Sequence, residues 1–271
     1  MRFLMFAVVA VFLFTSCKKD EIREPAPADA SMAKYVVDGI KEEIDHQLNL
    51  EGSLNGFTDG DGPRGGCATV SISPSGNVFP KTVTITFPQN CTTYAGARIE
   101  GTVSLVISGK VREAGTTVDF TLKDFKYKTF LFSGKYHLIF NGGLSHTTTI
   151  TDGVIVNSDG KTITYNATNN STQIEGMATT YKTNPTTFLH DDVYEISTTG
   201  SGINTKGNNF TIQSKSPLVL KISCQWLTTG IIEITEDSTP SIKATLDYGD
   251  NVCDNQAVLT FNNLSRTISL P

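Results

Sequence analysis

Two clusters of acidic side chains are where this sequence could support chemistry. His190, Asp191 and Asp192 are consecutive, and an imidazole beside two carboxylates could bind a metal or supply the paired carboxylates of glycoside hydrolysis. On a β-strand neighbouring side chains point to opposite faces, so at most His190 and Asp192 would share one. The sequence favours the alternative, a polar turn that leads into a strand over residues 193–196.

The second cluster contains Asp247, Asp250 and Asp254, next to Cys253. Carboxylates at this spacing can ligate Ca²⁺ when a loop adds backbone carbonyls. Turns use Asp side chains for local hydrogen bonds as well. The turn interpretation is favoured, so no cofactor is expected, with Ca²⁺ as the open alternative.

Cys17 is the residue whose chemistry the sequence specifies best. A positively charged start precedes the unbroken apolar run Phe3–Phe14, and two small residues stand directly before the cysteine. This pattern is typical of a lipoprotein signal peptide over residues 1–16, whose cleavage leaves Cys17 as an acylated N-terminus. The apolar run is shorter than the roughly 20 residues that a membrane-spanning helix needs. We therefore expect the chain to attach to a membrane through lipid.

The other four cysteines are Cys67, Cys91, Cys224 and Cys253. An even number in an exported chain favours disulfides, and three pairings are possible in principle. Separations of 24 and 29 residues favour the local bridges Cys67–Cys91 and Cys224–Cys253. A zinc site would need a closely spaced Cys or Cys/His pair, which this sequence lacks.

The elements that must position these residues begin after a tether. Residues 17–30 are charged and then rich in Pro and Ala, which predicts a flexible linker. Residues 31–50 have the period of an amphipathic helix, expected to pack on the domain's own core, with a partner-binding helix as the alternative. Residues 51–66 are rich in Gly and Asp and predict a loop. The apolar stripe of the helix consists of Met32, Val36, Ile40, Ile44 and Leu48.

From Cys67 onward the hydrophobic period changes to two. Segments such as Thr82–Phe87 and Ala257–Phe261 alternate apolar residues with Thr, Ser or Asp, and turn signals lie between them. Such alternation is typical of half-exposed antiparallel strands. The sequence predicts an all-β, mainly antiparallel and sandwich-like domain over residues 67–271, with the single helix against it. Its two hairpins, each bracketed by a pair of cysteines, resemble each other. Two related modules, or a single domain with a disulfide at each end, would both fit this pattern. We favour the single domain.

The charge balance limits the partners. Cleavage of residues 1–16 removes only Arg2 from the 22 Lys and Arg, against 27 Asp and Glu, so the mature chain stays acidic. It contains no basic block, and nucleic acid is therefore not an expected partner. A glycan or an envelope protein is the expected partner instead.

Several segments give the chain a resemblance to a known family. It resembles a family of uncharacterised lipoproteins from Bacteroidota over nearly the whole mature chain, most specifically at Asp247–Asn255. Phe87–Cys91 departs from that pattern, since the family tends to carry an Asp-Gly-like turn there. The resemblance implies an outer-membrane address and a β fold, but no reaction. The other matching segments are Cys67–Ser71, Phe79–Ile85, Asp191–Ile196, Ser216–Val219 and Cys224–Trp226.

The same resemblance implies an orientation. That phylum uses a Lys/Asp/Glu-rich segment after the lipidated cysteine to send lipoproteins to the outer face of the outer membrane. Lys18, Lys19, Asp20 and Glu21 look like such a segment, with the periplasmic face as the alternative. Around Ser238, the triplet Asp-Ser-Thr resembles the O-glycosylation acceptor of the phylum, which predicts a glycan there.

No catalytic constellation is recognisable in the sequence beyond the acidic clusters. We therefore expect a surface-exposed outer-membrane lipoprotein that binds a partner or has a structural role, without catalysis. The alternative is an envelope hydrolase that acts on polysaccharide with Asp191 and Asp192. Trp226, the single tryptophan, is expected to pack in the core rather than stack on a sugar.

Overall fold

The computed structural model describes residues 67–76, 78–92, 96–178 and 191–270. Throughout this part the chain is all-β, and no helix occurs in it. The same residues contain no helix that is long and apolar enough to cross a membrane. The expected helix over 31–50 lies outside the described residues, as do the signal peptide, the tether, the Gly/Asp loop and His190.

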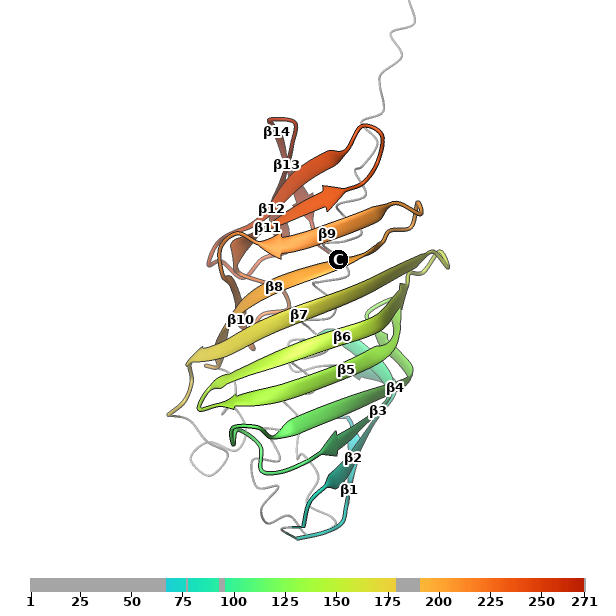
Figure 1. Ribbon diagram of the computed structural model, residues 1–271, viewed down its shortest axis with the longest axis vertical. Helices are drawn as coiled ribbons and strands as arrows, with labels where there is room; N and C mark the ends of the chain where they lie inside the picture. The colour runs from blue at the N-terminus through green and yellow to red at the C-terminus, as the bar shows by residue number, and fades with distance from the viewer. Residues whose placement is uncertain (1–66, 77, 93–95, 179–190, 271) are drawn as a thin grey trace, which may run out of the picture.

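Fourteen strands form one antiparallel sheet (Figure 1). Nearly every strand pairs with the next along the chain, while β8 and β11 are joined by β10 at one end and β9 at the other. In chain order the strands are β1 (Thr69–Ser73), β2 (Lys81–Thr92), β3 (Arg98–Ile107), β4 (Thr117–Tyr127), β5 (Phe130–Gly142), β6 (Ser145–Val156), β7 (Thr162–Glu175), β8 (Val193–Ile203), β9 (Asn209–Ser214), β10 (Leu218–Lys221), β11 (Thr229–Glu236), β12 (Ile242–Asp250), β13 (Gln256–Phe261) and β14 (Leu264–Ser269).

The alternation in the sequence decides which face of the sheet is buried. On β2, Val83, Ile85 and Phe87 are buried, whereas Thr82 and Thr86 are exposed. Successive side chains of a strand point to opposite faces, so the apolar set of every strand collects on one side. One apolar core results, which includes residues from Val83 to Leu270. The all-β, antiparallel expectation is confirmed.

The sheet is curled, so that connections between strands that are distant in it meet. Lys128, in the β4–β5 turn, has its ammonium 5.3 Å from the ring centroid of Trp226, in the β10–β11 loop. Four strands, β5 to β8, separate β4 from β10 in the sheet. Such a contact requires the right-handed twist of the strands to accumulate across the sheet. Hydrogen bonds join all fourteen strands of the described residues into one sheet.

The absence of a side chain at Gly153 allows an aromatic ring from the neighbouring strand to lie against the backbone of β6. A Cβ atom at Gly153 would lie 2.7 Å from two ring carbons of Tyr165, on the neighbouring strand β7. The Tyr165 ring therefore lies against the backbone of β6, and its hydroxyl is 2.8 Å from that of Tyr136 on β5. Burial raises the pKa of Tyr136 to about 12, so the Tyr136 phenol stays neutral.

Candidate functional site

Asp192 has the most perturbed carboxyl group of the described residues. It lies directly before β8 and is only 2% exposed. Its Oδ1 accepts a hydrogen bond of 2.8 Å from Nε2 of Gln173, and its Oδ2 accepts one of 3.4 Å from the Tyr194 hydroxyl. Burial raises the pKa of Asp192 to about 7, against the opposing positive charge of Arg112. Perturbed carboxyls of this kind are enriched at functional sites.

The register of β7 and β8 brings these groups together. Gln173 on β7 is directly opposite Tyr194 on β8, so the side-chain amide of Gln173 lies beside Asp192, which directly precedes β8. The other end of the same amide, Oε1, accepts a hydrogen bond of 3.0 Å from the Arg112 guanidinium. Arg112 comes from the β3–β4 loop and is exposed. Gln173 thus connects an exposed positive charge to a buried carboxyl.

A row of buried polar side chains continues from this site along the inner face. On β6, β7 and β8 they face one another in register, His146 opposite Ser171 and Thr148 opposite Asn169, which is opposite Thr198. Each is at most 5% exposed. Thr198 donates a hydrogen bond of 2.5 Å to Oδ1 of Asn169. We call these five residues, with Gln173 and Asp192, the inner polar cluster.

Asp191 and Asp192, the expected carboxylate pair, do not share an environment. Asp191 is exposed, whereas Asp192 is buried and hydrogen-bonded to protein groups. Two carboxylates that flank a glycosidic bond must both reach the substrate. The structure therefore offers no support for glycoside hydrolysis by these two residues.

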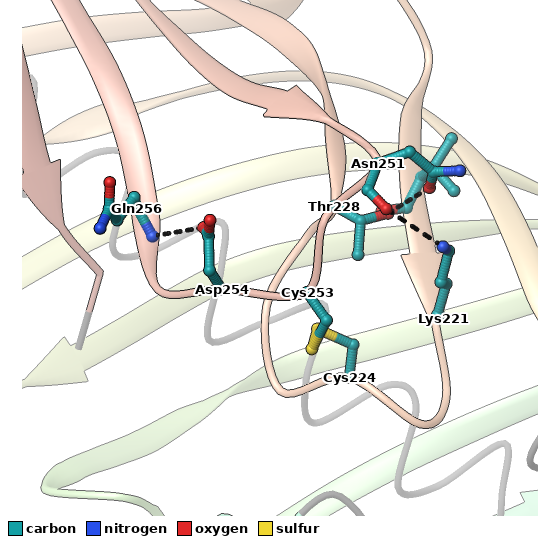
Figure 2. The surroundings of a disulfide bond; sticks show 8 residues. Lys221, Cys224, Thr228, Asn251, Cys253, Asp254 and Gln256 are labelled. Atoms are coloured by element: carbon teal, nitrogen blue, oxygen red, sulfur yellow. Dashed lines mark hydrogen bonds between the residues drawn. A yellow bond between two sulfur atoms is a disulfide. The ribbon is translucent and has the colours of Figure 1, made fainter.

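Two of the three aspartates near Cys253 accept local backbone hydrogen bonds. Oδ1 of Asp247 accepts a hydrogen bond of 2.9 Å from the backbone N–H of Gly249. Oδ1 of Asp254 accepts one of 2.9 Å from the N–H of Gln256 (Figure 2). Asp250 is exposed at the end of β12. Within the described ranges no group of three or more His, Cys, Asp or Glu could hold a metal ion. The geometry favours the turn interpretation.

Both local disulfides are present. The Cα atoms of Cys67 and Cys91 are 5.4 Å apart, and those of Cys224 and Cys253 are 5.7 Å apart. Figure 2 shows Cys224–Cys253 beside Asn251, whose side-chain oxygen accepts a hydrogen bond of 3.0 Å from the Thr228 hydroxyl. The bond therefore ties the β10–β11 loop to the β12–β13 connection.

Trp226 lies partly buried against the core, in the same loop as Cys224. The ammonium of Lys128 lies over its ring, and burial lowers the pKa of Lys128 to about 8. One face of the indole is thus occupied by the chain's own lysine, which agrees with a packing role. Ser238 lies in the β11–β12 turn, where its hydroxyl donates to the carbonyl of Pro240 at 2.8 Å.

Sequence reasoning missed Arg112, Gln173 and the inner polar cluster. The sequence did indicate that these polar residues point inward. Asn169 and Ser171 lie an even number of residues from the buried Ile163 and Tyr165, so all four side chains share one face of β7. Polar residues at inward positions of a strand indicate buried hydrogen-bonding groups. Sequence reasoning also missed Asp119 as the partner of His137: their Oδ1 and Nδ1 atoms are 2.7 Å apart on exposed parts of β4 and β5.

Comparisons with known proteins return no match to this chain, whether with protein-family models, curated proteins or solved structures. The candidate site therefore has to be interpreted from its own geometry.

Proposed function

We propose that this protein is a lipid-anchored binding module on the outer surface of a bacterial outer membrane. The observation that carries the proposal is the pairing of four cysteines into two bridges in a chain whose first residues match the pattern of a lipoprotein signal. Disulfides form and persist in oxidising compartments outside the cytoplasm. The bridges and the signal thus point to the same compartment by independent routes.

Cys17 is the anchor in this proposal. A single acyl chain holds a protein to a bilayer only marginally, and stable attachment takes at least two hydrophobic signals. A lipoprotein cysteine with several acyl chains meets this requirement. Lys18, Lys19, Asp20 and Glu21 direct the anchored chain to the outer leaflet, and residues 17–30 hold the β domain away from the lipid surface.

Replacing Cys17 with Ser should move the protein from the membrane fraction to the soluble fraction of the producing cells. Radiolabelled palmitate should enter the wild-type chain and not the variant. Replacing Lys18–Glu21 with Ala should leave the protein lipidated but protect it from protease added to intact cells. Membrane attachment of the Cys17→Ser variant would contradict the lipid anchor; protease resistance of the wild type would indicate the periplasmic face.

The proposed ligand is a glycan or another envelope component, bound without catalysis. The outer face of β6, β7 and β8 supports this, because Thr149, Thr168 and Thr199 lie opposite one another across the three strands. Hydroxyl and amide groups such as these donate to and accept from sugar hydroxyls. On the same face Thr147 donates a hydrogen bond of 2.8 Å to Oδ1 of Asn170.

A glycan array probed with the chain from residue 17, and a pull-down from envelope extracts, test the binding function. We expect retention of a ligand whose binding Thr168→Lys weakens, because the lysine would replace the middle threonine and its side chain would project over this face. Ser158→Lys, in the exposed β6–β7 turn, is the matched control. Shortening of a bound polysaccharide would instead favour the hydrolase alternative, and absence of any ligand would leave a structural role.

A further inference from the structure

One row of polar side chains crosses the outer face of the sheet without a break. On five neighbouring strands, β5 to β9, the residues of this row are direct cross-strand partners, and each side chain is exposed or partly exposed. Figure 1 shows these strands side by side. We call them the outer polar row, which in strand order consists of His137, Thr149, Thr168, Thr199 and Gln213.

The hydroxyl and amide groups of this row differ from the polar groups on either side of it. On one side Thr147 donates a hydrogen bond to Asn170 at 2.8 Å, and on the other Oδ1 of Asn166 accepts one from the backbone N–H of Asp152 at 3.0 Å. Among the described residues, no hydrogen bond joins the side chains of the three threonines or Gln213 to another protein group. A ligand can therefore bind the row without breaking a hydrogen bond of the fold.

The two ends of the row are charged and its middle is neutral. At the β5 end, Nδ1 of His137 is 2.7 Å from Oδ1 of Asp119, so a ligand would meet the other ring nitrogen, Nε2. Beyond the β9 end, Glu233 continues the row on β11 and forms salt bridges of 3.1 Å with Lys215 and 2.9 Å with Lys243. The neutral stretch between these ends matches an uncharged ligand that both donates and accepts hydrogen bonds.

The spacing of the row selects the shape of that ligand. Neighbouring strands of a sheet lie about 4.8 Å apart, so the five side chains extend over about 19 Å across the strands. A β-1,4-linked glycan is an extended ribbon whose sugars advance by nearly the same distance, whereas an α-1,4-linked glycan coils. An extended glycan can therefore place one sugar over each strand.

We infer that the outer polar row binds a linear, uncharged, β-1,4-linked glycan that lies across the strands, with one sugar over each of β5 to β9. The inference rests on the proposed binding function and specifies its ligand class and direction. Each threonine hydroxyl donates to and accepts from sugar hydroxyls, and Gln213 does the same through its amide. A hydrogen bond that replaces one to water contributes little by itself, so the affinity depends on the number of strands covered.

Isothermal titration calorimetry on the chain from residue 17, with Cys17→Ser and its disulfides intact, tests this site. The probes are β-1,4-linked oligomers of glucose and of N-acetylglucosamine with two to six sugars, and the α-1,4-linked glucose hexamer. For at least one β-1,4-linked series we expect the dissociation constant to fall with each sugar up to five and then to stay constant. The α-1,4-linked hexamer should bind about tenfold more weakly than the β-1,4-linked hexamer of that series.

The double variant Thr149→Val/Thr199→Val removes two hydroxyls of the row and keeps the shape of both side chains. It should raise the dissociation constant of the five-sugar oligomer about tenfold, since two hydrogen bonds are lost. Thr151→Val/Thr211→Val is the matched control, because Thr151 and Thr211 are exposed on the same strands, β6 and β9, two positions from the row. It should leave the dissociation constant unchanged.

Failure of the inference and failure of the binding function give different results. Equal dissociation constants for the two double variants, an affinity that stops rising at two sugars, or a preference for the α-1,4-linked hexamer would overturn the inference while leaving a binding function. Retention of an envelope protein, with no affinity for any oligomer, would do the same. Absence of any ligand, from the oligomers and from envelope extracts alike, would overturn both.

Discussion

Asp192→Asn will make the protein more stable above pH 7. The pKa of Asp192 is about 7 in the folded chain, well above the value of about 3.9 for an unfolded aspartate. Between these two values the folded state holds a proton that the unfolded state has lost, so stability falls as the pH rises through this window. Above the window the buried carboxylate costs on the order of 4 kcal/mol, and Asn removes this cost because it does not ionise.

Urea unfolding at pH 5 and pH 8 measures the effect. The wild type should lose about 2 to 3 kcal/mol more than the Asn variant between the two pH values, since most of the window lies between them. The Asn oxygen can still accept the hydrogen bond from Gln173, so the fold should be kept. Asp159→Asn, at an exposed turn, should reproduce the wild-type pH dependence. Parallel profiles for the wild type and the Asp192→Asn variant would show that Asp192 ionises normally.

Removing the Cys224–Cys253 bond, by replacing both cysteines with Ala, should lower the free energy of unfolding by about 3 to 4 kcal/mol. The bridge spans 29 residues, and closing a loop of this length restricts the unfolded chain by about that amount. The folded state is affected as well, because this bond holds the loop that carries Trp226 (Figure 2). Denaturant unfolding of the oxidised protein measures the loss.

The fluorescence of the single tryptophan reports on the loosening of its loop when the Cys224–Cys253 bond is removed. Trp226 lies under the Lys128 ammonium, so its fluorescence should change when the loop loosens. The double variant Cys67→Ala/Cys91→Ala is the control: its bridge spans 24 residues, so its stability should fall by a similar amount, but the native fluorescence should stay. Unchanged stability in either double variant would show that its bridge is absent in solution.

Two parts of the candidate site show how far sequence reasoning reached. The pairing of the cysteines was predictable, because two residues that bracket one hairpin are brought together by that hairpin alone. The inner polar cluster was not predicted, because its hydrogen bonds join β7 and β8, and Gln173 is also bonded to Arg112 of the β3–β4 loop, 61 positions away in the sequence. No local pattern indicates that contact. The alternation of β7 shows which residues of the inner polar cluster on that strand point inward, but it does not show which groups they bond to.

The sequence by itself determined that this chain forms antiparallel strands from Cys67 onward and where its disulfides close. These properties follow from local patterns: the alternation of apolar and hydroxyl residues sets the buried face, and short connections pair neighbouring strands. Only the tertiary structure decided that Asp191 is exposed while Asp192 is buried with a raised pKa, and that Lys128 meets Trp226. The physical reason is that burial and charge depend on the curl of the whole sheet, which sums the twist of many strands and brings together residues that no local pattern connects.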